Sequence, residues 1–328
     1  MTSTTGSQRV AVADIGGTHA RFALATVEGG KVVELGEPVT LKTADHASLQ
    51  TAWQEFGRTI GEPLPDAAGI AFAGPVEGEV LKLTNNPWVI RKALMKDRLG
   101  VERFVIVNDF AAVAHAVAQL DYDQFEHLCG PDQPFTTDGV LTVLGPGTGL
   151  GVGQVLREKG SYHVIPTEGG HVDFAPLDSL EDQILDFLRR SFRRVSIERV
   201  ACGPGLANLY NAIAAIEDQP VRQVDDRTIW DAALAGADPL AVAALDRFFL
   251  ILGAVAGDLA LVHGANGVVV AGGLGYRLRE RFRLSGFADR FAAKGRFERR
   301  MEAIPVKLIT HPQAGLYGAA AAFAQEHA

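Results

Sequence analysis

Two glycine-rich turns, each lying between apolar segments, constrain the fold of this chain more than any other feature of its sequence. The first is Asp14-Ile15-Gly16-Gly17-Thr18, and the second is Gly145-Pro146-Gly147-Thr148-Gly149-Leu150-Gly151. The apolar residues before and after each turn predict a strand, a turn and a second strand. Glycines in such a turn allow backbone N–H groups to approach a phosphate without a Cβ in the way. The pair of turns therefore predicts a nucleotide held between two halves of the chain.

These turns differ from the commoner nucleotide-binding loops, which lead from a strand into a helix. The chain has no Gly-x-x-x-x-Gly-Lys-Ser/Thr segment, and Val152 stands where a Gly-x-Gly-x-x-Gly loop would need its third glycine. Taken singly, each turn is better explained as an ordinary β-hairpin. Because both turns carry a threonine beside their glycines, Thr18 and Thr148, the pair favours nucleotide binding.

Length, charge and cysteine content limit the number of domains, the kinds of binding partner and the cellular compartment that are expected for this chain. The chain has 328 residues, 47% of them hydrophobic, and this length predicts about two domains. The 31 Lys and Arg residues against 39 Asp and Glu give a net charge of −8 with no long basic run, which disfavours nucleic acid or an anionic membrane as partner. Cys129 and Cys202 are far apart and form no zinc motif, as expected in a reducing cytoplasm.

No segment is expected to direct the chain to a membrane or out of the cell. Residues 1–9 are polar and lack the apolar core of a signal peptide. The apolar segment 248–263 is shorter than a membrane span and contains Asp258. We therefore expect this segment to be a buried helix.

The order of predicted elements indicates an α/β fold with two related halves. The first half has expected strands at 10–14, 21–27, 31–37, 68–72, 80–83 and 104–107, a helix at 46–60, a polar turn at 84–87 and a helix beginning at 108–109. The second half has expected strands at 140–144, 151–157, 162–165 and 267–271, and helices at 179–192, 205–216, 228–235 and 240–263. We assign residues 1–118 and 312–328 to a small lobe, onto which the C-terminal helix folds back, and residues 119–311 to a large lobe, with a cleft between them.

Asn108 and Asp109 follow a predicted strand and begin a helix, where open α/β sheets usually place ligand-binding groups. A carboxylate at a helix N-terminus stays ionised, which suits a base that accepts a hydroxyl proton. The same position equally suits a helix N-cap. A second strand end, at Gly272-Gly273, leaves room for a flat ring to approach the backbone, although such a pair is more often a tight turn or a close helix contact.

The segment Glu168-Gly169-Gly170-His171-Val172-Asp173 places acids and a histidine around a diglycine turn. The two-residue spacing from His171 to Asp173, with no cysteine nearby, favours a polar binding loop over a zinc or iron site. A sugar requires buried carboxylate, imidazole and amide groups to pair its hydroxyls, and Glu168 and His171 suit that role. Glu198 is ambiguous, because a single Glu on a helix is usually solvated.

Taken together, these segments resemble the bacterial glucokinase family, within the superfamily that also holds hexokinases, actin and heat-shock chaperone ATPases. The resemblance covers nearly the whole chain. Seven motifs in order carry it: Asp14-Ile15-Gly16-Gly17-Thr18, Thr84-Asn85-Asn86-Pro87-Trp88, Asn108-Asp109-Phe110, Gly147-Thr148-Gly149-Leu150-Gly151, Glu168-Gly169-Gly170-His171-Val172-Asp173-Phe174-Ala175-Pro176, Gly203-Pro204-Gly205-Leu206 and Ala271-Gly272-Gly273.

The resemblance implies two actin-like (ribonuclease H-like) lobes, with mixed sheets flanked by helices and the active site in the cleft between the lobes. It implies a cytoplasmic, homodimeric enzyme that phosphorylates D-glucose at the 6-hydroxyl with ATP and Mg²⁺, at the start of glycolysis. In this family Asp109 would be the general base. The residues that would bind the sugar are Asn108, Asp109, Glu168, His171 and Glu198. The residues that would bind ATP are Asp14, Gly16, Gly17, Thr18, Gly147, Thr148, Gly149, Gly272 and Gly273, with Asp14 holding Mg²⁺ directly or through water.

Two positions depart from the family pattern: His19 stands where Asn is frequent, and Thr167 where Gly is usual. The chain lacks the cysteine-rich zinc motif of the related repressor–kinase sugar family, and no helix-turn-helix precedes Val10, which argues against a sugar-sensing repressor. Two alternatives stay open. One is a kinase for another hexose, and the other is a non-catalytic, actin-like ATP-binding switch that would need the glycine turns but not the sugar-binding set.

Overall fold

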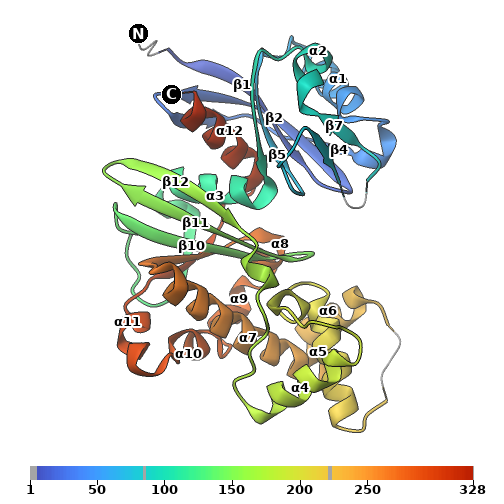
Figure 1. The fold of residues 1–328 in the computed structure, drawn as a ribbon, viewed down its shortest axis with the longest axis vertical. Coiled ribbons are helices and arrows are strands. Elements are labelled where there is room, and N and C mark those ends of the chain that lie inside the picture. Colours follow the sequence, from blue (N-terminus) through green and yellow to red (C-terminus); the bar gives the residue numbers. More distant parts are fainter. Residues whose placement is uncertain (1–5, 84–85, 221–223, 328) are drawn as a thin grey trace. The chain divides into compact units, whose positions relative to one another are not determined.

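The computed structural model describes residues 6–83, 86–220 and 224–327, so Thr84 and Asn85 of the predicted polar turn lie outside the described residues. The chain divides into two compact units (Figure 1). Unit 1 comprises Met1–Asp121 and His311–Ala328, and unit 2 comprises Tyr122–Thr310. Each unit is built on one mixed sheet, as the α/β prediction requires.

The sheet of unit 1 has the strand order β3-β2-β1-β5-β8, with β4 also paired to β2. Strands β1 and β2 are antiparallel, whereas β1, β5 and β8 run parallel. The strands are β1 (Gln8–Ile15), β2 (His19–Glu28), β3 (Lys31–Leu35), β4 (Val39–Lys42), β5 (Ala67–Phe72) and β8 (Arg103–Asn108), with a separate hairpin of β6 (Val80–Lys82) and β7 (Val89–Arg91). The helices are α1 (Leu49–Ile60), α2 (Met95–Leu99), α3 (Asp109–Gln119) and α12 (Ala314–Glu326), with 3-10 turns η1 (Thr43–Asp45) and η2 (Lys92–Leu94).

Alternate residues of β1 bury opposite faces of this sheet, because side chains of a strand point alternately to its two sides. Val10 and Val12 join the core that contains Leu316 of α12, and Ala13 joins the core that contains Trp53 of α1. Helix α12 therefore folds back on unit 1, as predicted (Figure 1). Its approach to α3 is close enough that a Cβ at Gly318 would overlap the backbone of α3.

The sheet of unit 2 has the order β12-β11-β10-β13-β14-β9. Its first five strands repeat the order and directions of unit 1: an antiparallel meander, then two parallel strands on the other side of the first strand. The duplication predicted from the two turns is therefore confirmed. The strands are β9 (Phe125–Cys129), β10 (Gly139–Pro146), β11 (Leu150–Glu158), β12 (Ser161–Thr167), β13 (Gly267–Val270) and β14 (Val306–Ile309).

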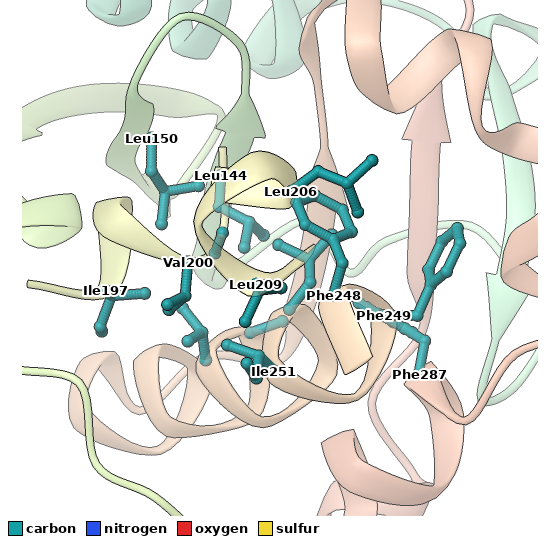
Figure 2. Close-up of a cluster of buried hydrophobic side chains, with 14 of the residues drawn as sticks. Leu144, Leu150, Ile197, Val200, Leu206, Leu209, Phe248, Phe249, Ile251 and Phe287 are labelled. Carbon is teal, nitrogen blue, oxygen red and sulfur yellow. The ribbon is translucent and has the colours of Figure 1, made fainter. Parts of the chain in front are cut away.

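Helix α7 (Pro239–His263) forms the centre of the unit 2 core, packed against α5, α6 and α10. Figure 2 shows Phe248 and Phe249 of α7 in the same buried cluster as Leu206 and Leu209 of α5. By length and composition α7 could span a membrane, but 67% of its most apolar window is buried within the fold, as expected for the apolar segment 248–263. The helices of unit 2 are α4 (Ser179–Arg189), α5 (Gly205–Ile216), α6 (Asp226–Ala235), α7, α8 (Gly272–Arg277), α9 (Arg279–Phe282), α10 (Phe287–Ala292) and α11 (Glu298–Glu302), with 3-10 turns η3 (Tyr122–Gln124), η4 (Gly169–His171), η5 (Ile197–Arg199) and η6 (Gly295–Phe297).

Candidate active site

The first turn, residues 16–18, joins β1 to β2 and forms the predicted hairpin. The Gly16 N–H donates to the His19 carbonyl at 3.0 Å, which closes the turn. Two side chains outside the hairpin hold it. The Thr43 hydroxyl and the Asn86 amide both donate to the Gly17 carbonyl, at 2.7 and 3.1 Å.

Asp14 lies at the end of β1, immediately before the first turn, and its carboxylate is largely buried. Burial raises the pKa of this carboxyl, and the Arg21 guanidinium, 3.3 Å away, partly offsets the increase. The carboxylate also lies against Gly315 in the first turn of α12, where a Cβ would be 2.9 Å from Oδ2. A buried, incompletely paired carboxylate beside a glycine turn is suited to a cation.

Asn108 and Asp109 lie where β8 ends and α3 begins, as predicted. The cap is Asn108, whose Oδ1 accepts from the Phe110 and Ala111 N–H groups at 2.9 and 3.2 Å. Asp109 is the first residue of the helix, and its Oδ1 also accepts from the Phe110 N–H at 2.9 Å.

The carboxyl of Asp109 has a raised pKa. Burial is the main cause, the hydrogen bond from Phe110 opposes it, and the nearby charge of Asp14 adds to it. A carboxylate destabilised in this way accepts a proton more readily than an exposed Asp does. Unit 1 therefore brings the first turn, Asp14 and Asp109 together.

The second turn, residues 147–149, joins β10 to β11 and forms the second predicted hairpin. The Gly147 N–H donates to the Gly149 carbonyl at 2.8 Å, and the Gly147 carbonyl accepts from the Gly203 N–H at 2.7 Å. Glu198 stabilises the end of this turn, since its Oε2 accepts a hydrogen bond from the Leu150 N–H at 2.8 Å. This carboxylate fills the space where a Cβ of Gly149 would lie, so a larger residue there would require the Glu198 side chain to move.

Gly272 and Gly273 follow β13 and begin α8, so the strand end leads into a helix. Gly272 has a positive φ of 88°, and a Cβ there would lie 3.2 Å from the Pro146 carbonyl at the second turn. Unit 2 therefore brings the second turn, Glu198 and Gly272 together.

Glu168 and His171 are not buried, contrary to the sequence-based expectation for a sugar site. Their side chains are 85% and 58% exposed within the fold, and His171 Nε2 lies 3.9 Å from Glu168 Oε2. The reason is the diglycine between them. A Cβ at Gly169 would press on Val152 and one at Gly170 on Leu150, so the glycines take the inner side of η4 and the polar side chains project outward.

Thr167, the departure from the family pattern, supports this turn. Its hydroxyl donates to the Val152 carbonyl at 3.0 Å and accepts from the Gly169 N–H at 3.2 Å. Asp173, at the other end of the segment, pairs with Arg194 at 2.5 Å. Asp173 is thus engaged in a structural ion pair.

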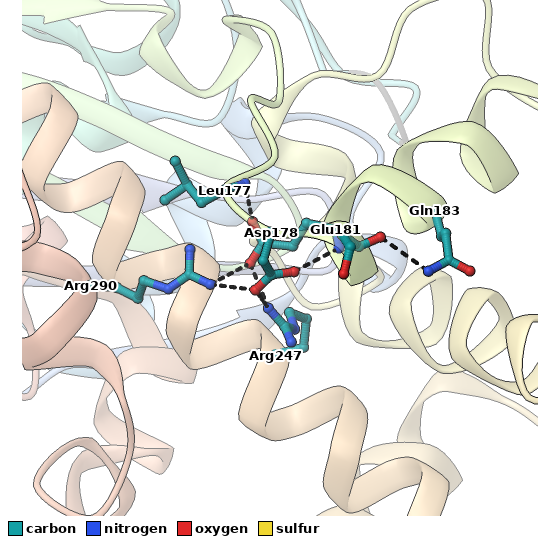
Figure 3. Close-up of polar contacts among 7 residues, drawn as sticks. Leu177, Asp178, Glu181, Gln183, Arg247 and Arg290 are labelled. Carbon is teal, nitrogen blue, oxygen red and sulfur yellow. Dashed lines mark hydrogen bonds and ion pairs between the residues drawn. The ribbon is translucent and has the colours of Figure 1, made fainter.

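A half-buried ion-pair cluster fixes the chain that follows η4 (Figure 3). Asp178 caps α4 through the Glu181 N–H at 3.0 Å. Arg247 of α7 lies 2.5 Å from Asp178 and 2.8 Å from Glu181, and Arg290 of α10 lies 2.6 Å from Asp178. Breaking one member of such a cluster leaves a charge without a partner, so the cluster anchors the start of α4 to two helices of the core.

Four side chains that support the turns were not identified as supports from the sequence. They are Arg21, Thr43 and Asn86 at the first turn and Glu198 at the second. Each acts on a residue distant in the chain, except Arg21, which pairs with Asp14 across the hairpin. Among the described residues, no three His, Cys, Asp or Glu side chains form a metal-binding group. A single carboxylate such as Asp14 still fits Mg²⁺, which usually keeps several waters and takes its other ligands from nucleotide phosphates.

Two units of the same strand order, each with a glycine hairpin, define an α/β protein of the actin-like ATPase fold. The glucokinase family model matches residues 11–326. Relatives include glucokinases of Zymomonas mobilis, 61% identical over 96% of this chain and 97% of the relative, and of Paramagnetospirillum magneticum, 42% identical over 96% and 97%. A crystal structure of a glucokinase from an Antarctic psychrotroph is 35% identical, with a TM-score of 0.86 over 96% of this chain and 98% of that one. The chain belongs to the glucokinase family.

Proposed function

We propose that this protein transfers the γ-phosphoryl group of ATP to the 6-hydroxyl of D-glucose, giving glucose 6-phosphate and ADP. The observation that carries the proposal is Asp109, a partly buried carboxylate of raised pKa at a strand–helix junction, beside Asp14 and the first turn. Family membership supports the reaction class and the substrates. One solved relative at 24% identity is a glucokinase in complex with glucose.

In the proposed mechanism the oxygen of the sugar 6-hydroxyl bonds to the γ-phosphorus of ATP, and Asp109 accepts the proton of that hydroxyl. The bond from that phosphorus to the bridging oxygen of ADP breaks, and ADP leaves with the electron pair. A positioned base contributes about 10²–10⁴-fold to the rate, and the remaining acceleration comes from positioning and charge stabilisation. Asn108, fixed as the cap of α3, holds sugar hydroxyls through its amide, which also donates to the Gly74 carbonyl at 3.2 Å.

Glu168, His171 and Glu198 are proposed to complete the sugar contacts. Glu198 has one carboxylate oxygen engaged with Leu150, so Oε1 is the atom available to a sugar hydroxyl. Glu168 and His171 project from η4 with their polar atoms exposed, ready to exchange water for substrate hydroxyls. Carboxylate and imidazole groups that pair with specific hydroxyls reject sugars that lack them.

The nucleotide is proposed to bind through both turns. Backbone N–H groups of Gly17 and Thr18, and of Thr148 and Gly149, would face its phosphates. Gly16 and Gly147, whose N–H groups close the two turns, would line the phosphate site, and Gly272 and Gly273 would lie against adenosine. Mg²⁺, held at Asp14 directly or through water, would neutralise charge on the phosphates. We further propose that the two units correspond to the two lobes of the kinase.

The cellular setting is also a proposal. Reduced thiols fit a cytoplasmic enzyme: Cys129 and Cys202 are both free, and burial raises the pKa of these thiols to about 12 and about 11. We also propose that the protein is a homodimer and that it acts at the start of glycolysis. Light scattering on the purified protein tests the oligomeric state.

A coupled assay with ATP, Mg²⁺ and a panel of hexoses tests the function. We expect glucose to give the highest kcat/KM, and little ATP hydrolysis without sugar, because water could otherwise accept the phosphoryl group. A higher kcat/KM for mannose, fructose or an amino sugar would indicate another hexose kinase. Nucleotide binding without turnover of any hexose would indicate a non-catalytic switch.

A further inference from the structure

The carbonyl of Gly17 accepts two hydrogen bonds from side chains that lie far away in the sequence. The Thr43 hydroxyl donates at 2.7 Å and the Asn86 amide at 3.1 Å. A carbonyl oxygen has two lone pairs, so both are used. In addition, the Thr43 N–H donates to the next carbonyl of the turn, Thr18, at 3.0 Å.

Both donors are themselves fixed. Thr43 is 2% exposed and belongs to η1. The Asn86 amide is oriented by the Trp88 N–H, which donates to Oδ1 at 2.8 Å. The indole of Trp88, buried in the core, donates to the His46 carbonyl just after η1 at 2.8 Å. These bonds connect η1, the Asn86 segment and the first turn into one network.

This network sets the direction of the peptide group between Gly17 and Thr18. The described peptide bonds are all trans, and in a planar trans peptide the carbonyl and the N–H point in opposite directions. Because the Gly17 carbonyl points to Thr43 and Asn86, the Thr18 N–H points away from them. The Thr18 N–H is therefore directed to the side of the turn opposite these two donors, and Thr18 itself is exposed.

We infer that Thr43 and Asn86 are positioning residues for phosphate binding at the first turn. They hold the Gly17–Thr18 peptide with its N–H toward the ATP phosphates, so that binding does not have to reorient the turn. Pre-organised donors of this kind raise affinity by reducing the ordering cost on binding. The inference rests on the proposed function, and it assigns to these two side chains an effect on ATP and none on glucose.

Steady-state kinetics of Thr43→Val, Thr43→Ser and Asn86→Ala test the inference. Thr43→Val keeps the shape and removes the hydroxyl, and we expect a rise of about five- to tenfold in KM for ATP, the effect of one lost hydrogen bond. KM for glucose should stay within about twofold of the original value, and Thr43→Ser, which restores the hydroxyl, should restore KM for ATP. Asn86→Ala is expected to act in the same direction.

The matched control is Thr51→Val, which removes a hydroxyl that donates to the Ser48 carbonyl at 2.9 Å in the same unit. It should lower thermal stability without changing KM for ATP. Equal rises in the KM for ATP and for glucose in Thr43→Val, or no rescue by serine, would overturn the inference. If the unsubstituted protein phosphorylates no hexose, the proposed function fails instead. Calorimetric titration with MgATP then decides the inference by itself: weaker binding by Thr43→Val supports it, and unchanged binding overturns it.

Discussion

The two glycine turns have the same strand–turn–strand frame but different surroundings. The first is held by neutral donors, Thr43 and Asn86, and lies beside two largely buried carboxylates whose pKa is raised. The second is held by a carboxylate, Glu198, which accepts a backbone hydrogen bond. Under the proposed function, the duplicated frame serves two different tasks. The desolvated charges of unit 1 suit proton and phosphoryl transfer, whereas the hydrogen-bonded and exposed acids of unit 2 suit ligand binding.

The largest effect is expected from Asp109→Asn. The amide cannot accept the hydroxyl proton, so kcat should fall by about 10²–10⁴-fold, while calorimetric titration should find glucose affinity nearly unchanged. Glu168→Gln is the matched control in unit 2, and it should act mainly on KM for glucose. An unchanged kcat in Asp109→Asn would remove this residue from the mechanism and, with it, the catalytic difference proposed between the two units.

Gly149→Ala is expected to have the next largest effect. The new Cβ would overlap the Glu198 carboxylate, so Glu198 must move away from the Leu150 N–H and the second turn loses its support. We expect KM for ATP to rise by about tenfold, the effect of roughly 1.4 kcal/mol. Gly147→Ala is the comparison within the same turn: it also adds a methyl group to the proposed phosphate site, but its nearest neighbour would be the Gly149 carbonyl oxygen, 4.0 Å away, so Glu198 is not displaced. Equal effects of the two substitutions would contradict the role given to Glu198.

Glu198 itself allows a finer separation of its two proposed contacts. Gln at this position keeps an oxygen that can accept from Leu150 but loses the charge, so KM for glucose should rise while KM for ATP stays within about twofold. Ala removes the acceptor as well, and KM for ATP should then rise by about fivefold. If Gln and Ala gave the same KM for ATP, the hydrogen bond to Leu150 would be irrelevant to nucleotide binding.

The sequence predicted the features that depend on local pattern. Glycines between apolar segments predicted both hairpins. Helical spacing from Leu49 to Ile60 predicted α1, which begins three residues later than the expected start at 46. The sequence missed β14, because a lysine, Lys307, interrupts a short apolar segment. That lysine is fully buried and pairs with Asp132 at 3.0 Å, a partner that no local pattern reveals. The sequence pattern likewise predicts no helix in the arginine-rich segment that forms α9 to α11.

The candidate site shows the same limit. The position of Asn108 and Asp109 at a strand end followed from the pattern, but the choice of Asn108 as cap depended on hydrogen bonds to Phe110 and Ala111. The expected burial of Glu168 and His171 was wrong. It was inferred from the hydrogen-bonding requirement of a sugar, which does not determine how η4 packs within the fold. Supports such as Thr43 and Glu198 act through contacts 26 and 48 residues away in the chain, which only the folded structure brings together.

The smallest effect, and the sharpest comparison of the two acidic environments, is the pH dependence of stability. Burial raises the folded pKa of Asp109 above its ordinary value of 3.8. The folded state then binds the proton more tightly than the unfolded state. The stabilising contribution of the protonated carboxyl is present below pH 3.8 and is lost as the pH rises through the folded pKa. Asp109→Asn avoids this loss.

The Tm of Asp109→Asn should therefore match that of the unsubstituted protein near pH 4 and exceed it by about 1–3 °C at pH 7. Scanning calorimetry between these pH values measures the difference. A lower Tm for Asp109→Asn at pH 7 would mean that the carboxylate stabilises α3 through the Phe110 N–H more than its burial costs. Asp109 would then be a helix-capping group of the same kind as Asn108. Its carboxylate would not differ in kind from the hydrogen-bonded acids of unit 2.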